Sequence, residues 1–401
     1  MNQCLNHSIM ESLGLYIQVP FCASKCTFCN FSSQAAPTSV YEPYIAAIEW
    51  EAALFPHLCG CIGLREGFAQ LPVDTVYLGG GTPTLLGAGK LKKIFGAIRR
   101  HFKMNQVIEI TIEMTPGSAD DALLEYLLHL GVNRLSIGAQ SFDDRELRPV
   151  GRLHSAAETV EQVEAARRAG FRNLSLDVIA GLPYQTLESW RKSLQALAWI
   201  EPEHVSIYLF EADEKSRLGK EVLQHGRLSH AGELPDEDFM ARAYEIACEF
   251  LAKEGYEHYE ISNFARPGRR SIHNQKYWQR QPYLGLGAGA HSFDGGQRWA
   301  NEVSPESYQS RVERDELPIV ERRAVGPAGE MEEFFFLGLR QREGVSLEQA
   351  RLRWGNPPLN GWIEKARRLE NEGFLKQAEG RLSLTERAYL VSNEIFQEFI
   401  C

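Results

Sequence analysis

Strand and helix patterns alternate six times between residues 15 and 210 of this chain of 401 residues. Short apolar runs alternate with segments whose apolar residues recur at helical spacing. Parallel strands joined by right-handed helical crossovers account for this order, and six units are too few for a closed eight-fold barrel. The sequence therefore predicts an α/β fold, an open partial (β/α)6 barrel of the TIM type, with its chemistry at the C-terminal strand ends. The strands are predicted at residues 15–19, 73–78, 107–114, 134–139, 173–179 and 204–210, and the main helices at 41–58, 119–130, 156–169 and 187–200.

Three cysteines with the spacing C-x3-C-x2-C, Cys22, Cys26 and Cys29, directly follow the first predicted strand. Spacing this tight is typical of metal-binding thiolates rather than of ordinary buried thiols. Three thiolates are one ligand short of the usual four of a structural zinc site or an iron–sulfur cluster. One interpretation is a zinc site completed by a distant residue such as Cys59 or Cys61. The other is a cluster with one open iron, where a reactant can bind.

Polar residues lie at or near the ends of the later strands. Glu113, Gln140 and Asp177 each end an apolar run, and Arg152 lies in the segment after the fourth strand. Buried polar groups need partners, so these side chains either cap helices and pair at the barrel rim or bind a ligand. Three glycines at 79–81 follow the second strand, and they let the backbone approach a ligand because no Cβ intervenes.

Together these segments resemble the signature of radical S-adenosylmethionine (SAM) enzymes. The similar phrases are GGGTP at 79–83, E-x-x-P-G at 113–117, S-x-G-x-Q-S-F at 136–142 and D-x-x-x-G-L-P at 177–183. The resemblance implies that the three cysteines hold a [4Fe-4S] cluster whose fourth iron is chelated by SAM, and that reductive cleavage of SAM yields a 5′-deoxyadenosyl radical. It also implies that SAM is contacted by Tyr16, Phe28, Gly80, Gly81, Thr82, Glu113, Gln140, Arg152 and Asp177.

Two positions depart from the family pattern. Gln18 stands where a His is usual, and Tyr184 stands where a Gly is frequent. Neither position is a predicted cluster ligand. Gln18 nevertheless changes the hydrogen bonding that is expected next to the cluster.

From residue 15 to 301, and more loosely beyond, the chain resembles the branch that contains oxygen-independent coproporphyrinogen III dehydrogenase and the heme chaperone HemW. The segment His273-Asn274-x-x-Tyr277-Trp278 is similar to the HNxxYW phrase of the chaperones. This resemblance implies that His273 binds heme, and an imidazole beside aromatic rings suits axial ligation. The alternative is an aromatic packing corner without a ligand.

Two functions of different classes share these motifs. One is a heme chaperone of the HemW type, which binds the cluster, SAM and heme and transfers heme to an acceptor protein. The other is the dehydrogenase, a radical SAM oxidative decarboxylase that forms protoporphyrinogen IX. Phe31 stands where the dehydrogenase typically has a fourth cysteine, and only 15 residues precede Tyr16, where the dehydrogenase has a longer arm. Both features favour the chaperone; no catalytic residue is predicted, and a cluster-free zinc scaffold is the third alternative.

The sequence predicts three domains: the barrel core at 1–235, an extension at 236–315 that carries the HNxxYW segment, and a small module at 316–401. Residues 218–234 are polar and are expected to form a loop. In the last module, helices at 330–340, 347–354 and 363–372 precede strands at 373–377 and 380–384. This order is that of a winged-helix-like α+β module. Its mixture of Arg and Glu favours docking over nucleic-acid binding.

Composition limits the partners and the compartment. The formal net charge of −10 argues against a nucleic-acid partner. The sequence has no run of 18 apolar residues, so it predicts no membrane span. Peripheral contact with a membrane stays open. Residues 1–12 lack the features of a secretory signal, and the cysteine triplet needs reduced thiols. We therefore expect a cytoplasmic protein whose partners are heme or another porphyrin, a heme acceptor and, if SAM is cleaved, an electron donor.

Overall fold

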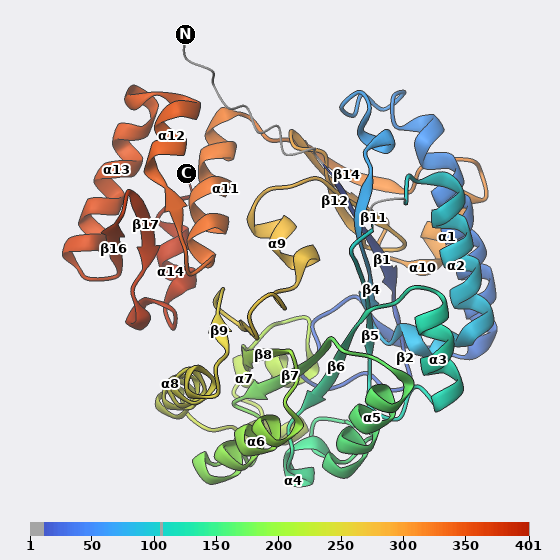
Figure 1. The fold of residues 1–401 in the computed structure, drawn as a ribbon, viewed down its shortest axis with the longest axis horizontal. Helices are drawn as coiled ribbons and strands as arrows, with labels where there is room; N and C mark the ends of the chain where they lie inside the picture. Colours follow the sequence, from blue (N-terminus) through green and yellow to red (C-terminus); the bar gives the residue numbers. More distant parts are fainter. Residues whose placement is uncertain (1–11, 105–106, 401) are drawn as a thin grey trace.

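The computed structural model describes residues 12–104 and 107–400, so most of the N-terminal segment at 1–12 lies outside the described residues. Six parallel strands, in the order β1-β4-β5-β6-β7-β8, form an open barrel (Figure 1). The predicted partial (β/α)6 barrel is confirmed. Its strands are β1 (Leu13–Val19), β4 (Val73–Gly80), β5 (Glu109–Met114), β6 (Arg134–Gln140), β7 (Leu174–Ala180) and β8 (His204–Leu209).

Helices cover the outer face of the barrel, and their ends follow from local capping. In α5, for example, the Ser155 side chain accepts from the Glu158 backbone N–H while the Glu158 side chain returns to Ser155. The sequence analysis did not predict α2, in which three glycines weaken the helical signal, although Leu91, Ile94 and Ile98 form a buried face. The helices are α1 (Tyr41–Leu58), α2 (Gly87–His101), α3 (Asp121–His129), α4 (Asp144–Leu147), α5 (Ala156–Ala169) and α6 (Leu187–Ile200).

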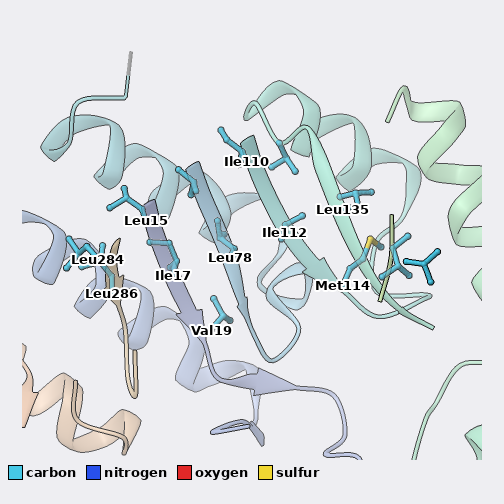
Figure 2. Packing of buried hydrophobic residues seen from close by; sticks show 14 of the residues in the cluster. Leu15, Ile17, Val19, Leu78, Ile110, Ile112, Met114, Leu135, Leu284 and Leu286 are labelled. Atoms are coloured by element: carbon cyan, nitrogen blue, oxygen red, sulfur yellow. The ribbon is translucent and has the colours of Figure 1, made fainter. Parts of the chain in front are cut away.

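The barrel strands carry apolar side chains on their outer face. Figure 2 shows Leu15, Ile17 and Val19 of β1 in line with Leu78 of β4 and Ile112 of β5. Each fully buried side chain of this kind contributes about 1.5–3 kcal/mol to folding. Because side chains alternate along a strand, the intervening residues face the barrel interior, and most of them are polar.

The sheet continues beyond the barrel on both edges, which the sequence analysis did not predict. On one side, β11 pairs parallel to β1 and is followed by three antiparallel strands; on the other, β10 and β9 follow β8. The boundaries predicted near 235 and 315 stay predictions, and the segment between them contributes strands to the same twelve-stranded sheet. These elements are α8 (Glu237–Lys253), β9 (Glu257–His258), β10 (Asn263–Ala265), α9 (Ile272–Trp278), β11 (Tyr283–Leu286), β12 (His291–Phe293), β13 (Gln297–Asn301), α10 (Pro305–Val312) and β14 (Ile319–Ala324).

The prediction of a loop at 218–234 is wrong. The segment contains α7 (Arg217–Leu223) and a 3-10 stretch, η4 (Leu228–Glu233). The Ser216 side chain caps α7 by accepting from the Gly219 N–H, and Leu218 is fully buried. A single short apolar face among polar residues gives little periodicity, so the helix is not visible in the sequence.

The C-terminal module has the helix and strand order of a winged helix. Its three strands lie in the order β15-β17-β16, packed against helices (Figure 1). Helix α13 begins earlier than predicted, with Pro357 near its first turn, where proline is favoured. The elements are α11 (Pro327–Arg340), β15 (Val345–Ser346), α12 (Leu347–Trp354), α13 (Asn356–Asn371), β16 (Leu375–Ala378), β17 (Arg381–Leu384) and α14 (Ser392–Gln397). Among the described residues, no helix has the length and apolar character needed to cross a membrane.

Candidate functional site

The cysteine loop lies at the C-terminal mouth of the barrel, directly after β1. Its two ends are joined where β2 (Phe21–Cys22) pairs with β3 (Gln34–Ala35). In the middle, the Thr27 N–H donates to the Val150 carbonyl at 3.0 Å, and the Leu218 N–H of α7 donates to the Thr27 carbonyl at 2.8 Å. The loop is therefore held from both sides before any metal binds.

The three predicted metal ligands are neighbours in space. All three thiols are partly exposed, and the charges of Cys26 and Cys29 both act on Cys22. In the part of the chain that the structure describes, no three His, Cys, Asp or Glu side chains converge on a single ion. A cubane takes each thiolate on a different iron, so it does not require the three sulfurs to converge on one ion.

Neither Cys59 nor Cys61 is placed to complete a zinc site with the triplet. Helix α1 starts beside the cysteine loop, where Tyr41 stacks on Phe21 with ring centroids 4.7 Å apart. The helix has 18 residues, so its far end lies about 27 Å away. Cys59 and Cys61 follow that far end.

All three cysteine sulfurs have a donor group within hydrogen-bond distance. The Thr82 hydroxyl is 3.9 Å from Cys22 Sγ, Arg152 Nη1 is 3.6 Å from Cys26 Sγ, and the Ser33 hydroxyl is 3.7 Å from Cys29 Sγ. Burial raises the pKa of the Cys22 thiol, and hydrogen bonds from Thr82 and Ser33 act in the opposite direction. The sequence analysis missed Ser33, since a serine four residues after the last cysteine has no distinguishing pattern.

The glycine segment lies against the end of β1. A Cβ on Gly81 would be 2.5 Å from the Phe21 carbonyl oxygen and 2.8 Å from that of Val19. Gly80 has φ of +101°, and its Cβ would meet the Gln18 amide. The Thr82 N–H donates to the Phe21 carbonyl at 2.7 Å. Only glycine fits here, because the backbone lies against other atoms of the protein. The close approach of this backbone to a ligand stays a prediction.

Two predicted ligand-binding carboxyl groups face the barrel interior. Glu113 accepts from the Tyr77 hydroxyl and the Gly80 N–H, both at 2.9 Å, and burial raises its pKa to about 7. Burial also raises the pKa of Asp177, which accepts from the Ser136 hydroxyl at 3.3 Å. Its second oxygen, Oδ1, is buried and finds no hydrogen-bond partner among the described residues. Such a group is suited to a polar ligand.

The remaining predicted SAM residues lie around the same mouth. The Tyr16 hydroxyl donates to Gln18 Oε1 at 2.7 Å, and Gln18 Nε2 donates to the Ser32 carbonyl at 3.3 Å. Arg152 also donates to the Gly138 carbonyl, and its buried Nε has no partner within the described chain. Phe28 packs on an apolar cluster at the ends of β7 and β8, and Gln140 ends β6 with φ of +67°.

His273 lies deeper than the mouth, with its ring centroid 6.4 Å from that of Tyr16 and 5.3 Å from that of Tyr77. It is fully buried in α9, between β4 and Tyr277, toward the N-terminal ends of the strands. Its Nδ1 is 2.9 Å from the Thr75 hydroxyl and its Nε2 is 2.8 Å from the Tyr277 hydroxyl. Burial lowers its pKa to about 3, so the imidazole is neutral. Both ring nitrogens are engaged, and heme ligation by His273 stays a prediction.

Comparison with known proteins first defines the class. Residues 16–197 match the family model of the radical SAM superfamily, and residues 327–391 match that of the HemN C-terminal domain. The solved structure of coproporphyrinogen III oxidase (HemN) from Escherichia coli superposes with a TM-score of 0.83, covering 97% of this chain and 90% of that one. At 23% identity this likeness shows the fold. The chain has the radical SAM fold, with its C-x3-C-x2-C motif at the barrel mouth.

Curated relatives then define the particular family. Heme chaperone HemW of Bacillus subtilis (strain 168) is 33% identical over 387 residues, which is 96% of this chain and 98% of the relative. Heme chaperone HemW of Lactococcus lactis is 30% identical and covers 96% of each chain. The chain belongs to the HemW family.

Proposed function

We propose that this chain is a cytoplasmic heme chaperone that holds a [4Fe-4S] cluster through Cys22, Cys26 and Cys29, binds SAM beside it, and transfers heme to an acceptor protein. One observation carries the cofactor part: three neighbouring thiols lie at the barrel mouth, and each has a hydrogen-bond donor beside it. The heme part is supported by the similarity to relatives named heme chaperones.

The residues at the mouth fit both cofactors. When bound, the cluster supplies an open iron and an electron. Glu113 and Asp177 would accept hydrogen bonds from the ribose hydroxyls and the ammonium group of SAM, and Arg152 would bind its carboxylate. Phe28 would pack against adenine. The unpartnered atoms Asp177 Oδ1 and Arg152 Nε are consistent with a polar ligand between them.

Anaerobic reconstitution with iron and sulfide tests the cofactor part. The wild-type protein is expected to gain iron, sulfide and visible absorbance, and SAM is expected to change its EPR spectrum. Cys22→Ser, Cys26→Ser and Cys29→Ser should each lose the cluster, whereas Cys61→Ser should keep it, because Cys61 lies at the far end of α1. A colourless, iron-free wild-type protein contradicts the proposal, and stoichiometric zinc would favour a zinc scaffold.

Heme titration tests the role proposed for His273. If its Nε2 ligates heme, the hydrogen bond to Tyr277 must open first. His273→Ala should then weaken heme binding and change the Soret band, whereas Tyr277→Phe should strengthen binding by freeing the nitrogen. Unchanged affinity and spectrum in His273→Ala remove this ligand while leaving the chaperone proposal in place.

An assay with coproporphyrinogen III separates the chaperone from the dehydrogenase. The reconstituted protein with SAM and a reductant is expected to form no protoporphyrinogen IX and to release heme to an acceptor. The exposed Phe31, at the position where the dehydrogenase has a cysteine, supports this expectation. Robust decarboxylation of two propionates would overturn the assignment in favour of the enzyme.

A further inference from the structure

The three cluster cysteines have hydrogen-bond donors that come from three separate parts of the chain. Thr82 follows β4, Arg152 follows α4, and Ser33 lies in the cysteine loop directly before β3. Thr82 lies 3.9 Å from Cys22 Sγ, Arg152 lies 3.6 Å from Cys26 Sγ, and Ser33 lies 3.7 Å from Cys29 Sγ and also acts on Cys22. A donor at every sulfur is an arrangement that cysteine spacing alone does not require.

The donors are held in place by other contacts. Ser33 and Thr82 are each only 6% exposed. The Ser33 N–H donates to the Phe31 carbonyl at 2.8 Å, and the Thr82 N–H donates to the Phe21 carbonyl at 2.7 Å. Their hydroxyls are therefore directed by the backbone of the cysteine loop, and they need no rearrangement to reach the sulfurs.

The direction of these hydrogen bonds follows from the chemistry of the ligand. A cysteine that holds iron is a thiolate, which accepts hydrogen bonds and donates none. Ser33 and Thr82 must then donate. One-electron reduction adds a negative charge to the cluster and its thiolates, with no proton and no broken bond, so donors stabilise the reduced form more than the oxidised form.

We propose that Ser33, together with Thr82 and Arg152, raises the reduction potential of the cluster by donating hydrogen bonds to its cysteine sulfurs. This inference rests on the proposed cluster. Ser33 is the clearest probe, because its replacement by alanine removes a donor without changing charge, and no role in SAM or metal binding is predicted for it. It is a positioning and tuning residue rather than a catalytic one.

The chain offers a matched control next to Ser33. Ser32 is exposed, and its hydroxyl makes no hydrogen bond recorded in the described residues. Ser32→Ala therefore removes the same atom one position away. Ser33→Thr keeps the hydroxyl and is expected to preserve the potential.

Potentiometric EPR titration without SAM measures the effect. With dithionite as the one-electron reductant, Ser33→Ala is expected to lower the ratio of reduced to oxidised cluster at a fixed potential about tenfold, equivalent to about 59 mV for a one-electron couple. Ser32→Ala and Ser33→Thr should titrate like the wild type. An intact cluster in Ser33→Ala with a wild-type midpoint overturns the inference.

If Ser33→Ala fails to assemble a cluster, Thr82→Val decides: a lowered midpoint supports the inference and an unchanged one refutes it. The two proposals fail differently. A wild-type protein without a cluster refutes the proposed function and this inference with it. A wild-type cluster that binds SAM, with no change of potential in the variants, refutes the inference alone.

Discussion

Among single residues, Gly81 shows how tightly the barrel mouth is built. Its α-carbon passes over the end of β1 so closely that no Cβ fits between it and two backbone carbonyls. Backbone atoms cannot rotate away as a side chain can, so the contact is rigid. The same approach brings Thr82 to the Cys22 sulfur. A glycine is required here by the protein's own backbone.

Gly81→Ala is therefore expected to destabilise the fold by about 1–3 kcal/mol, as overpacking does, and to weaken cluster retention. Gly96→Ala is the control, since its added Cβ meets no atom within 4 Å and the residue lies within α2. That variant should gain about 0.5–1 kcal/mol. Denaturant unfolding of the metal-free proteins measures both free energies of unfolding. A wild-type free energy of unfolding in Gly81→Ala would show that the backbone at the mouth shifts to make room for the added Cβ.

Among the elements, α7 lies against the cysteine loop. The Leu218 N–H donates to the Thr27 carbonyl, and the Leu218 side chain belongs to a small apolar cluster with Val150, Ile179 and Phe210. Phe28 of the cysteine loop packs on this cluster. The helix thus couples the cysteine loop to the ends of β7 and β8.

Leu218→Ala should destabilise this region by about 2–5 kcal/mol through the cavity that it leaves. We expect faster hydrogen exchange in residues 22–31 and faster loss of the reconstituted cluster. Leu223→Ala, in the same helix but 49% exposed, should change stability by less than about 0.5 kcal/mol. Unaltered exchange in residues 22–31 of Leu218→Ala would show that α7 does not hold the loop.

A buried carboxyl group connects α1 to the extended sheet and to α10. Glu51 is 2% exposed and accepts from the Gly287 N–H at 2.8 Å, the Tyr308 hydroxyl at 2.6 Å and the Asn301 amide at 2.7 Å. Burial raises its pKa from 4.5 to about 7, and these hydrogen bonds oppose the rise. The folded protein therefore keeps this proton to a higher pH than the unfolded chain does.

The pKa of Glu51 predicts a pH dependence of folding. Its protonation contributes up to about 3 kcal/mol to the free energy of unfolding below about pH 4.5, and this contribution is lost as pH rises to about 7. Glu51→Gln should remove this slope and cost about 1–3 kcal/mol, because its amide hydrogens face other donors. Urea unfolding of both proteins between pH 4.5 and 7 measures the difference; parallel curves would contradict the assignment.

At the scale of the whole molecule, one buried ion cluster joins the C-terminal module to the sheet. Glu333 of α11 is 4% exposed and contacts Arg280 Nε at 2.8 Å and Arg298 Nε at 2.6 Å. Burial alone would raise the pKa of Glu333, but hydrogen bonds from the two arginines lower it. The module lies beside α9 and the barrel (Figure 1), and this cluster is one charged part of their interface, to which the pair between Arg340 and the buried Glu260 at 2.8 Å also belongs.

Glu333→Ala leaves two arginines without their carboxylate and should cost about 3–5 kcal/mol. We expect the module to loosen first, with faster proteolysis near residue 326. Glu330→Ala removes a pair with Arg353 inside the module, where both side chains are partly exposed, and should cost no more than about 1 kcal/mol. Similar losses in both variants would mean that the interface depends on apolar packing instead.

The local patterns of the sequence predicted the barrel, and they predicted which segments lie at its C-terminal mouth. Strand and helix periodicity is set by neighbouring residues, so β1 and β4 to β8 appear close to their predicted limits. The cysteine spacing and the phrases after the strands are also local. Patterns of this kind can be recognised in the sequence because each lies within a few residues.

Contacts between distant segments were decided only by the tertiary structure. The strands beyond both barrel edges are short, and helix α7 shows its apolar face only when packed on the cysteine loop. The cysteine sulfurs are contacted by Ser33, Thr82 and Arg152, and Arg152 lies 126 residues from Cys26 in the sequence. The Nδ1 atom of His273 is engaged by the hydroxyl of Thr75, which lies 198 residues away in the sequence. Sequence patterns report only on residues that are close along the chain. Hydrogen bonds between distant residues depend on positions in space, and these positions are set by how the strands pair.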